Sequence, residues 1–210
     1  VFSSNVNSPT TQVAWTFRNA DKFYGHTTVT KSSGSNVTAS FSNLTTLGMV
    51  RVKRTDSTGS WYVWHRSLTA GKLLIGETTA AEATLGHITV SGTTVTLVNG
   101  VIADGSYLIE AWAHDTSTDG IIQCGSFTGT GTIGSQLASL GWEPQFLLVK
   151  CASTDANWYL LDVARGIPVG STAPVLTANS AVDESFWSGT ESYAPNATGF
   201  VSKTSTWAMN

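Results

Sequence analysis

Short stretches in which apolar and polar residues alternate recur along the whole chain, separated by polar turns. Alternation with a period of two, in stretches rich in β-branched and aromatic residues, is typical of half-buried β-strands. No long stretch carries a helical stripe, and only SQLASL at 135–140 has room for a short turn of helix. The pattern predicts strands at residues 12–18, 26–31, 37–41, 48–54, 60–66, 72–77, 87–91, 94–98, 106–114, 121–127, 145–151, 157–163, 174–177 and 199–203.

Three of the polar breaks have the composition of hairpin turns. The segment HITVSGTTVTL predicts a hairpin that turns at residues 91–93, where Gly accepts unusual backbone dihedrals. The breaks TDSTGS (55–60) and ASTDAN (152–157) each lie between two predicted strands and are rich in turn residues. The chain is therefore expected to be built of antiparallel hairpins.

The chain also matches itself at a separation of 97 residues. Trp15 and Trp112 are separated by this distance (112 − 15), and so are Trp61 and Trp158 (158 − 61). The ungapped match spans about 50 residues, after which the copies drift by a few positions. The same offset also aligns Val52-Lys53 with Val149-Lys150, and Trp61-Tyr62 with Trp158-Tyr159.

The repeat and the strand series predict an all-β protein made of two tandem antiparallel β-sandwich modules. Residues 1–25 are expected to hold the closing strand of a preceding module and a linker, residues 26–120 the first module, and residues 121–210 the second. The closing strand of the second module is expected beyond the end, so the chain is interpreted as a piece of a longer polypeptide. One larger jelly roll with internal pseudo-symmetry is the alternative arrangement.

Composition and charge narrow the possible partners. The 210 residues are 41% hydrophobic and 12% charged, and the net charge is −3. Without a basic stripe, nucleic acid is not expected as a partner. No apolar run approaches the roughly 20 residues that a membrane-spanning helix needs.

No catalytic constellation is recognisable, so an enzyme is not expected and no cofactor is predicted. The four histidines are scattered, and neither a GxSxG nor an HExxH motif occurs. The run from Gly129 to Gly134 spells a dinucleotide fingerprint but lacks the helix that the motif requires, so a turn is expected there. Cys124 and Cys151 are interpreted as buried free thiols, with a disulfide as the alternative.

A calcium loop is the one metal site that the sequence suggests. Oxygen-bearing side chains alternate at Asp115, Ser117 and Asp119, and Gly120 follows at the sixth position. The twelfth position holds Ser126 instead of the bidentate Glu. A polar turn is therefore favoured over calcium binding.

The tryptophans supply the candidate binding residues. The four that recur in the repeat (Trp15, Trp61, Trp112 and Trp158) are expected in cores, because large aromatic rings supply much of a core's buried area. Those without a repeated partner are candidates for stacking on sugars or for subunit contacts. The candidate binding residues are Trp64, His65, Arg66, Trp142, Asp162, Arg165 and Trp187, with an ion pair or edge packing as the alternative role for the charged ones.

Three segments of the chain resemble repeated domains in virion proteins of marine tailed phages. They are VKRTDSTGSWYVWHRSL (52–68), YLIEAWAHDTSTDGIIQCGSFTGTG (107–131), and GWEPQFLLVK with STDANWYLLDVARG (141–166). The shared order is a Gly-rich strand, a PxFLLVK strand, a Trp strand ending in Arg-Gly and an aromatic closing strand. The first copy departs from it at residues 47–48 and 66–67.

The resemblance implies a part of a phage particle with sandwich-like domains akin to lectin jelly rolls. The resemblance assigns no catalytic residues to this chain. The expected role is a tail-fibre or appendage subunit in the virion that contacts other virion proteins and itself, as a homotrimer, and binds host surface glycan. A capsid decoration protein, a carbohydrate-binding module of a larger protein and a glycan depolymerase are the alternatives.

Overall fold

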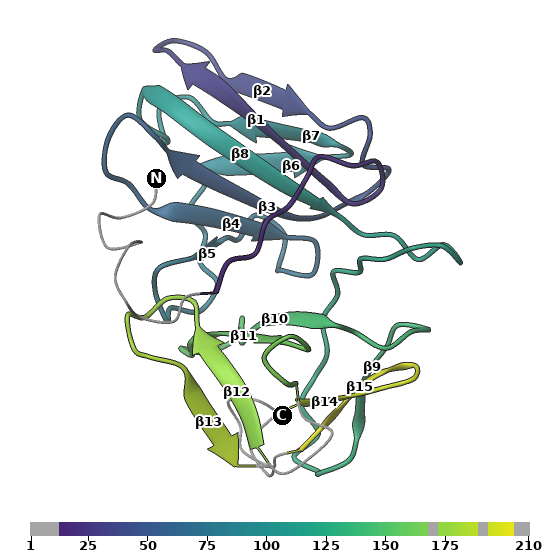
Figure 1. The fold of residues 1–210 in the computed structure, drawn as a ribbon. Helices are drawn as coiled ribbons and strands as arrows, with labels where there is room; N and C mark the ends of the chain where they lie inside the picture. The colour runs from purple at the N-terminus through teal and green to yellow at the C-terminus, as the bar shows by residue number, and fades with distance from the viewer. Residues whose placement is uncertain (1–12, 168–171, 189–192, 204–210) are drawn as a thin grey trace.

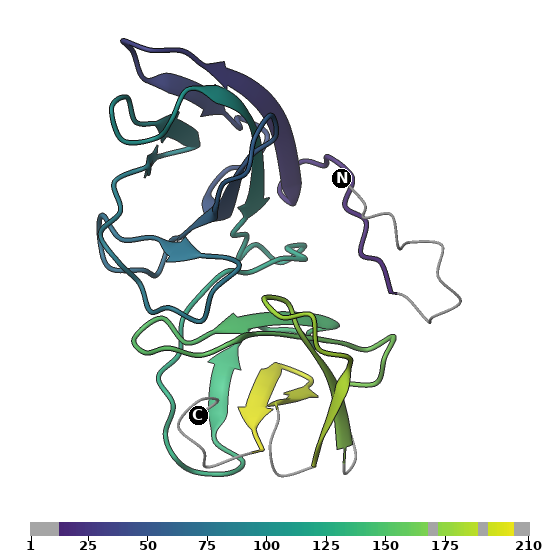
Figure 2. The same cartoon turned by 90° about the vertical axis from the view of Figure 1, so that its left-hand side faces the viewer.

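A computed structural model of the chain describes residues 13–167, 172–188 and 193–203. The all-β prediction is confirmed, because these residues form antiparallel strands and no helix. None of them forms a helix that is long and apolar enough to cross a membrane. The strands lie in two bodies, a first module of β1–β8 and a second module of β9–β15 (Figures 1 and 2).

The first module is a sandwich of two antiparallel sheets. Its larger sheet has the order β1-β8-β3-β4-β5 and its smaller sheet the order β2-β7-β6. The apolar side chains of alternate positions meet between the sheets, among them Val50, Val52, Val95 and Ile109. The strand bounds are β1 Tyr24–Lys31, β2 Val37–Ser40, β3 Leu47–Arg54, β4 Trp61–His65, β5 Leu74–Ile75, β6 Ile88–Ser91, β7 Thr94–Leu97 and β8 Gly105–Ala113.

The second module has its own sandwich and its own core. One sheet has the order β10-β11-β12-β13 and the other β14-β15-β9. Leu147, Leu161, Tyr193 and Phe200 are buried between them. The strand bounds are β9 Gln136–Ser139, β10 Phe146–Lys150, β11 Trp158–Asp162, β12 Thr172–Thr177, β13 Ser185–Ser188, β14 Tyr193–Asn196 and β15 Gly199–Ser202.

One hairpin occurs in both modules with the same register. Met49 pairs with His65 in the β3–β4 hairpin, and Phe146 pairs with Asp162 in the β10–β11 hairpin. Each residue of the second pair lies 97 positions after its counterpart in the first pair. The next strands, β5 and β12, correspond at a separation of 102 residues. Val63 pairs with Leu74 in the first module, and Leu160 pairs with Leu176 in the second. Beyond these three strands the sheet orders of the two modules differ within the described residues.

The modules contact each other through an apolar cluster and a pair of loops. Trp158 of the second module is buried with Val63 and Leu74 of the first, and Met49, Leu68 and Leu148 pack around them. The loops add backbone hydrogen bonds of 2.9 Å from Glu82 N to Ala152 O and 2.8 Å from Ala156 N to Thr79 O. Trp158 therefore lies where the faces of the two larger sheets meet.

Several local predictions were wrong. No strand forms at 121–127 or in the described part of 12–18, because no neighbouring strand donates hydrogen bonds there. Residues 135–140 hold strand β9 instead of a helical turn, since β15 pairs with it. The sequence pattern missed β13 and β14. The hairpin at 91–93 is confirmed, with Ser91 paired to Thr94.

Two of the four repeated tryptophans are buried as expected, although neither belongs to the core between the two sheets of its module. Trp112 and Trp158 are buried. Trp61 is half-buried, and Trp15 is 36% exposed in a segment that is not a strand. Trp61 and Trp158 occupy corresponding positions on corresponding strands, but only Trp158 is covered by the other module.

Candidate functional site

The face of the larger first-module sheet that points away from its core carries a group of aromatic and charged side chains. Strand alternation sends Val50 and Val52 inward, so their neighbour Arg51 lies on the opposite face. Register brings Arg51 opposite Glu110, and Trp112 opposite both Met49 and Tyr24. We call Tyr24, Arg51, Trp61, Glu110 and Trp112 the Arg51 cluster.

Arg51 is the centre of this cluster. Its Nε and Nη2 atoms donate hydrogen bonds of 3.1 and 2.6 Å to Glu110 Oε2. Its guanidinium carbon lies 4.8 Å from the ring centroid of Trp61 and 5.2 Å from that of Trp112. Such contacts with ring faces and with a carboxylate fix the guanidinium plane. The Nη1 group makes no hydrogen bond to any described residue.

Tyr24 fixes the other oxygen of the carboxylate. Its hydroxyl donates a 2.9 Å hydrogen bond to Glu110 Oε1. Burial, the hydrogen bond to Glu110 and the charge of Glu110 raise the pKa of Tyr24, so the hydroxyl stays protonated and remains a donor. Phe17 packs against the rings of Tyr24 and Trp112 at centroid distances of 5.6 and 6.0 Å. The cluster is thus rigid at Tyr24 and more exposed at Arg51 and Trp61.

Polar groups surround the cluster. Lys53 Nζ lies 5.5 Å from the Trp61 ring centroid. His26 and Thr28 are exposed on β1, and His26 pairs with Glu110 in register. An open pocket of about 290 Å³ adjoins His26, and no member of the Arg51 cluster lines it. It is lined by Asn19, Ala20, Asp21, Gly25, His26, Thr27, Ser40, Phe41 and Asn43.

Trp64, His65 and Arg66, predicted as binding candidates, do not form a common site. Trp64 points inward and packs against the first core. Burial, with the positive charges of Arg66 and His114, lowers the pKa of His65 to about 4, so this ring is neutral at pH 7. Arg66 is exposed, and its Nη1 lies 2.9 Å from His114 Nε2.

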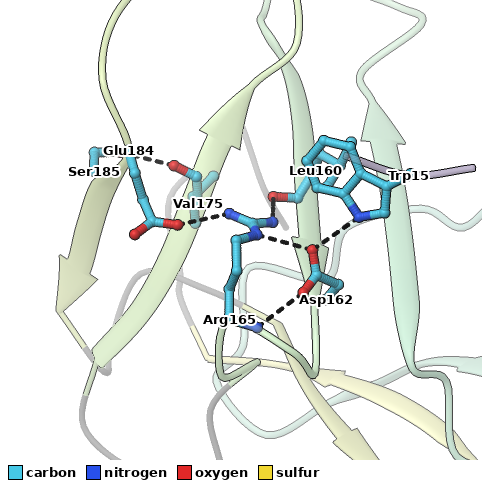
Figure 3. A network of polar contacts seen from close by, with 7 residues as sticks. All are labelled: Trp15, Leu160, Asp162, Arg165, Val175, Glu184 and Ser185. Carbon is cyan, nitrogen blue, oxygen red and sulfur yellow. Dashed lines mark hydrogen bonds and ion pairs between the residues drawn. The ribbon is translucent and has the colours of Figure 1, made fainter. Parts of the chain in front are cut away.

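Asp162 and Arg165 form the ion pair that was one of the two predicted roles (Figure 3). Arg165 Nε lies 2.8 Å from Asp162 Oδ2, and Arg165 Nη1 lies 2.9 Å from Glu184 Oε1. Arg165 Nη2 also donates to the carbonyl of Leu160, and Trp15 Nε1 donates a 3.1 Å hydrogen bond to Asp162. The Arg165 and Asp162 side chains are only 8% and 9% exposed, so the network serves the fold.

The remaining candidates are placed as follows. Trp142 is half-buried, and its indole N–H is buried without a hydrogen-bond partner among the described residues. The Trp187 side chain lies outside the described part of the structure. Asp115 and Asp119 each accept a hydrogen bond from Ser117, which gives a closed polar turn. The described residues contain no group of three or more His, Cys, Asp or Glu that suits a metal ion.

Both cysteines are free, as predicted, but each is half-buried instead of buried. Burial by itself raises the pKa of Cys151, but hydrogen bonds from the hydroxyl and backbone N–H groups of Thr154 and Ser153 lower it to about 7. Burial raises the pKa of Cys124 to about 12. Their reactivities should therefore differ widely.

We expect iodoacetamide to label Cys151 at least about a hundredfold faster than Cys124 at pH 7.5, because the thiolate is the nucleophile. The rate at Cys151 should rise with pH and level off above about pH 7. Mass spectrometry of timed digests measures both rates, and Cys151→Ser assigns the fast phase. Equal labelling of the two thiols would contradict the proposed stabilisation of the Cys151 thiolate.

Sequence reasoning missed the Arg51 cluster because it assigned Trp61 and Trp112 to cores. One local signal was present. In MVRVKR the charged residues Arg51 and Lys53 alternate with Val50 and Val52, which marks a charged face on an interior strand. The partner Glu110 lies 59 residues away, and only the pairing of β3 with β8 brings it to Arg51.

The family described as a domain of unknown function (DUF7483) matches residues 4–210, which include both modules. No curated protein matches the chain. No solved structure matches it.

Proposed function

The chain belongs to the DUF7483 family, and we propose that it is a non-catalytic structural and binding part of a tailed-phage particle, a tail-fibre or appendage subunit that contacts host surface glycan. The likeness of its repeated segments to phage virion domains supports the first part of the proposal. Two sandwich modules with a shared apolar contact provide a stiff scaffold, which suits a fibre or an appendage.

The Arg51 cluster is the observation that carries the glycan part. A sugar ring has an apolar C–H face that stacks on aromatic rings and hydroxyl groups that bind charged planar groups. The cluster offers the half-buried ring of Trp61 beside the fixed guanidinium of Arg51 and the carboxylate of Glu110. Because these side chains stand on paired interior strands, little ordering entropy is lost on binding.

The corresponding face of the second module is closed. Leu148 holds the position 97 residues after Arg51, and both Leu148 and Trp158 pack against the first module. Both faces take part in joining the modules, because Met49 and Val63 of the first module meet Leu148 and Trp158 of the second, and the ligand site is proposed for the part of the first-module face around Arg51. A leucine at position 148 suits the covered part of the second face, and an arginine at position 51 suits the uncovered part of the first.

A glycan array followed by titration with host surface polysaccharide tests the proposal. We expect Trp61→Ala to weaken binding about tenfold or more, which corresponds to about 1.4 kcal/mol, because it removes the stacking ring. Arg51→Gln should weaken binding as well, since it removes the charge-assisted donors.

Val101→Ala is the matched control, because Val101 is an exposed apolar side chain outside the Arg51 cluster. Its affinity should equal that of the unaltered chain. Absence of binding to any array glycan and to host polysaccharide would refute the glycan role. Antibody labelling of phage particles separates a tail location from a capsid location.

A further inference from the structure

The open pocket that adjoins His26 lies at a corner of the first module, apart from the Arg51 cluster. Its walls include two turns, residues 19–23 before β1 and residues 41–44 after β2. The two turns are tied together, because Lys22 N donates a 2.9 Å hydrogen bond to the carbonyl oxygen of Asn43. A pocket whose walls are joined through the backbone is preformed, which is the usual condition of a small-molecule site.

The first of these turns holds a strained backbone. Lys22 has a φ of 57°, and it is the one residue other than glycine with a positive φ in the described part of the chain. Such strain persists only where the surrounding structure imposes it, and it gathers at ligand sites and switches. The side chain of Lys22 does not line the pocket, and its Nζ lies 3.8 Å from Asp119 Oδ1.

The inner lining of the pocket depends on Gly25 of β1. A Cβ atom at this position would lie 3.0 Å from Cδ1 of Phe41 and 3.7 Å from Oδ1 of Asn43. Gly25 does not have a positive φ, so the space that it leaves is what matters here. That space lets the buried ring of Phe41 pack against the strand and sets Asn43 Oδ1 over it.

Polar side chains form the rest of the lining. Asn19 Oδ1 accepts a 3.1 Å hydrogen bond from His26 N and lies 2.7 Å from His26 Nδ1, so the amide group of Asn19 is held in place. Asn43 donates through Nδ2 to the carbonyl oxygen of Ala20, which leaves Oδ1 as its acceptor on the Gly25 side. The exposed Asp21 adds a carboxylate. The hydroxyl-bearing residues of the lining are Thr27 and Ser40.

The lining argues against charged ligands of two kinds. The described residues that line the pocket include no Lys or Arg, and Asp21 is negative, so phosphate, sulfate and carboxylate groups are disfavoured. A metal ion is not supported either, because the described residues contain no group of three or more His, Cys, Asp or Glu that suits one. The ligand must therefore be recognised through uncharged polar groups.

A sugar ring has the polar groups that match this lining. Each hydroxyl group donates one hydrogen bond and accepts others, so neighbouring hydroxyl groups can bind a carboxylate, an amide and a hydroxyl together. The volume of about 290 Å³ lies at the lower limit of the roughly 300–1,000 Å³ that is usual for small-molecule pockets. This size admits one sugar ring and not a longer chain.

We propose that this pocket binds a single neutral sugar unit through neighbouring hydroxyl groups. Register also places the pocket near the Arg51 cluster, since His26 lies opposite Glu110 and Glu110 lies opposite Arg51. Neighbouring strands are about 4.7–4.9 Å apart, so His26 and Arg51 are separated by roughly 10 Å. The end unit of a glycan that lies on the cluster can therefore reach the pocket. This last step rests on the proposed function, whereas binding of a single unit does not.

Titration of the isotope-labelled chain with methyl glycosides of neutral hexoses and of N-acetylhexosamines, followed by nuclear magnetic resonance, tests the proposal. We expect at least one glycoside to shift the side-chain amide signals of Asn19 and Asn43, with a dissociation constant in the millimolar range. Asp21→Asn should weaken this binding about fivefold or more, because it removes the charged acceptor. Methylammonium and inorganic phosphate are the charged probes, and each should bind more weakly than the best glycoside.

Asp183→Asn is the matched control, because Asp183 is also an exposed aspartate but belongs to the second module. It should leave the dissociation constant unchanged. Arg51→Gln should leave it unchanged too, so the result stands apart from that of the polysaccharide titration. The proposal is overturned if no glycoside shifts the amides of Asn19 and Asn43, or if Asp21→Asn has no more effect than the control. Tighter binding of methylammonium or phosphate would overturn the assignment of a neutral sugar.

Discussion

Replacing Trp158 with alanine is expected to lower the free energy of unfolding by about 3–5 kcal/mol, the usual cost of removing a buried Trp or Phe. The side chain is 6% exposed. It packs against Val63 and Leu74 of the first module and so joins the second module to the first. Urea unfolding followed by circular dichroism measures the loss. Because the contact joins the modules, the variant should also unfold in two separate transitions.

Two variants control this prediction. Trp158→Phe keeps most of the apolar volume and removes an indole N–H that has no hydrogen-bond partner among the described residues, so it should cost less than about 1.5 kcal/mol. Trp61→Ala alters the corresponding position of the first module, where the ring is only half-buried, and should cost less than Trp158→Ala. A single transition with a loss below about 1 kcal/mol in Trp158→Ala would show that the modules are not joined through this side chain.

Arg165→Met is expected to destabilise the second module by about 3–5 kcal/mol at pH 7, because it leaves the buried carboxylate of Asp162 without its cation. The hydrogen bond from Trp15 remains but supplies no charge. Thermal and urea unfolding at pH 7 measure the effect. Adding Asp162→Asn to this variant should recover part of the stability, since the uncompensated charge is then gone.

The loss should depend on pH in a defined direction. Burial by itself raises the pKa of Asp162, but the hydrogen bonds and charge of Arg165, with the indole N–H of Trp15, lower it below its ordinary value. The ion pair therefore stabilises the fold above the unfolded pKa of about 3.9, and this contribution is lost as pH falls through the folded pKa. In Arg165→Met the carboxylate is protonated more easily, so the difference between the two proteins should shrink on acidification.

Glu184→Gln is the control for the same network. Glu184 binds Arg165 but is exposed, so its removal should cost no more than about 1 kcal/mol. A difference between Arg165→Met and the unaltered protein that grows towards low pH would contradict the assignment of Asp162 as the stabilised carboxylate.

Local sequence patterns predicted most strands of both modules and the position of the shared hairpin. A strand's alternation is contained in five to ten neighbouring residues, and a turn in two to six, so both are readable without tertiary contacts. Asp162 and Arg165 are three residues apart at a strand end, and their ion pair was predicted as one alternative for the same reason. The predicted strand at 12–18 does not form in its described part. An alternating pattern describes one strand but does not provide the neighbouring strand that must pair with it.

The sequence by itself determined that this chain is all-β, where its hairpins turn, and that Trp61 and Trp158 occupy equivalent positions. Only the tertiary structure decided which parts of the equivalent faces are covered. Docking of the modules buries Trp158 and leaves Trp61 half-exposed beside Arg51, and pairing of β3 with β8 brings Glu110 to that arginine. Covering a face and pairing distant strands depend on residues far apart in the chain, and no local pattern records such contacts.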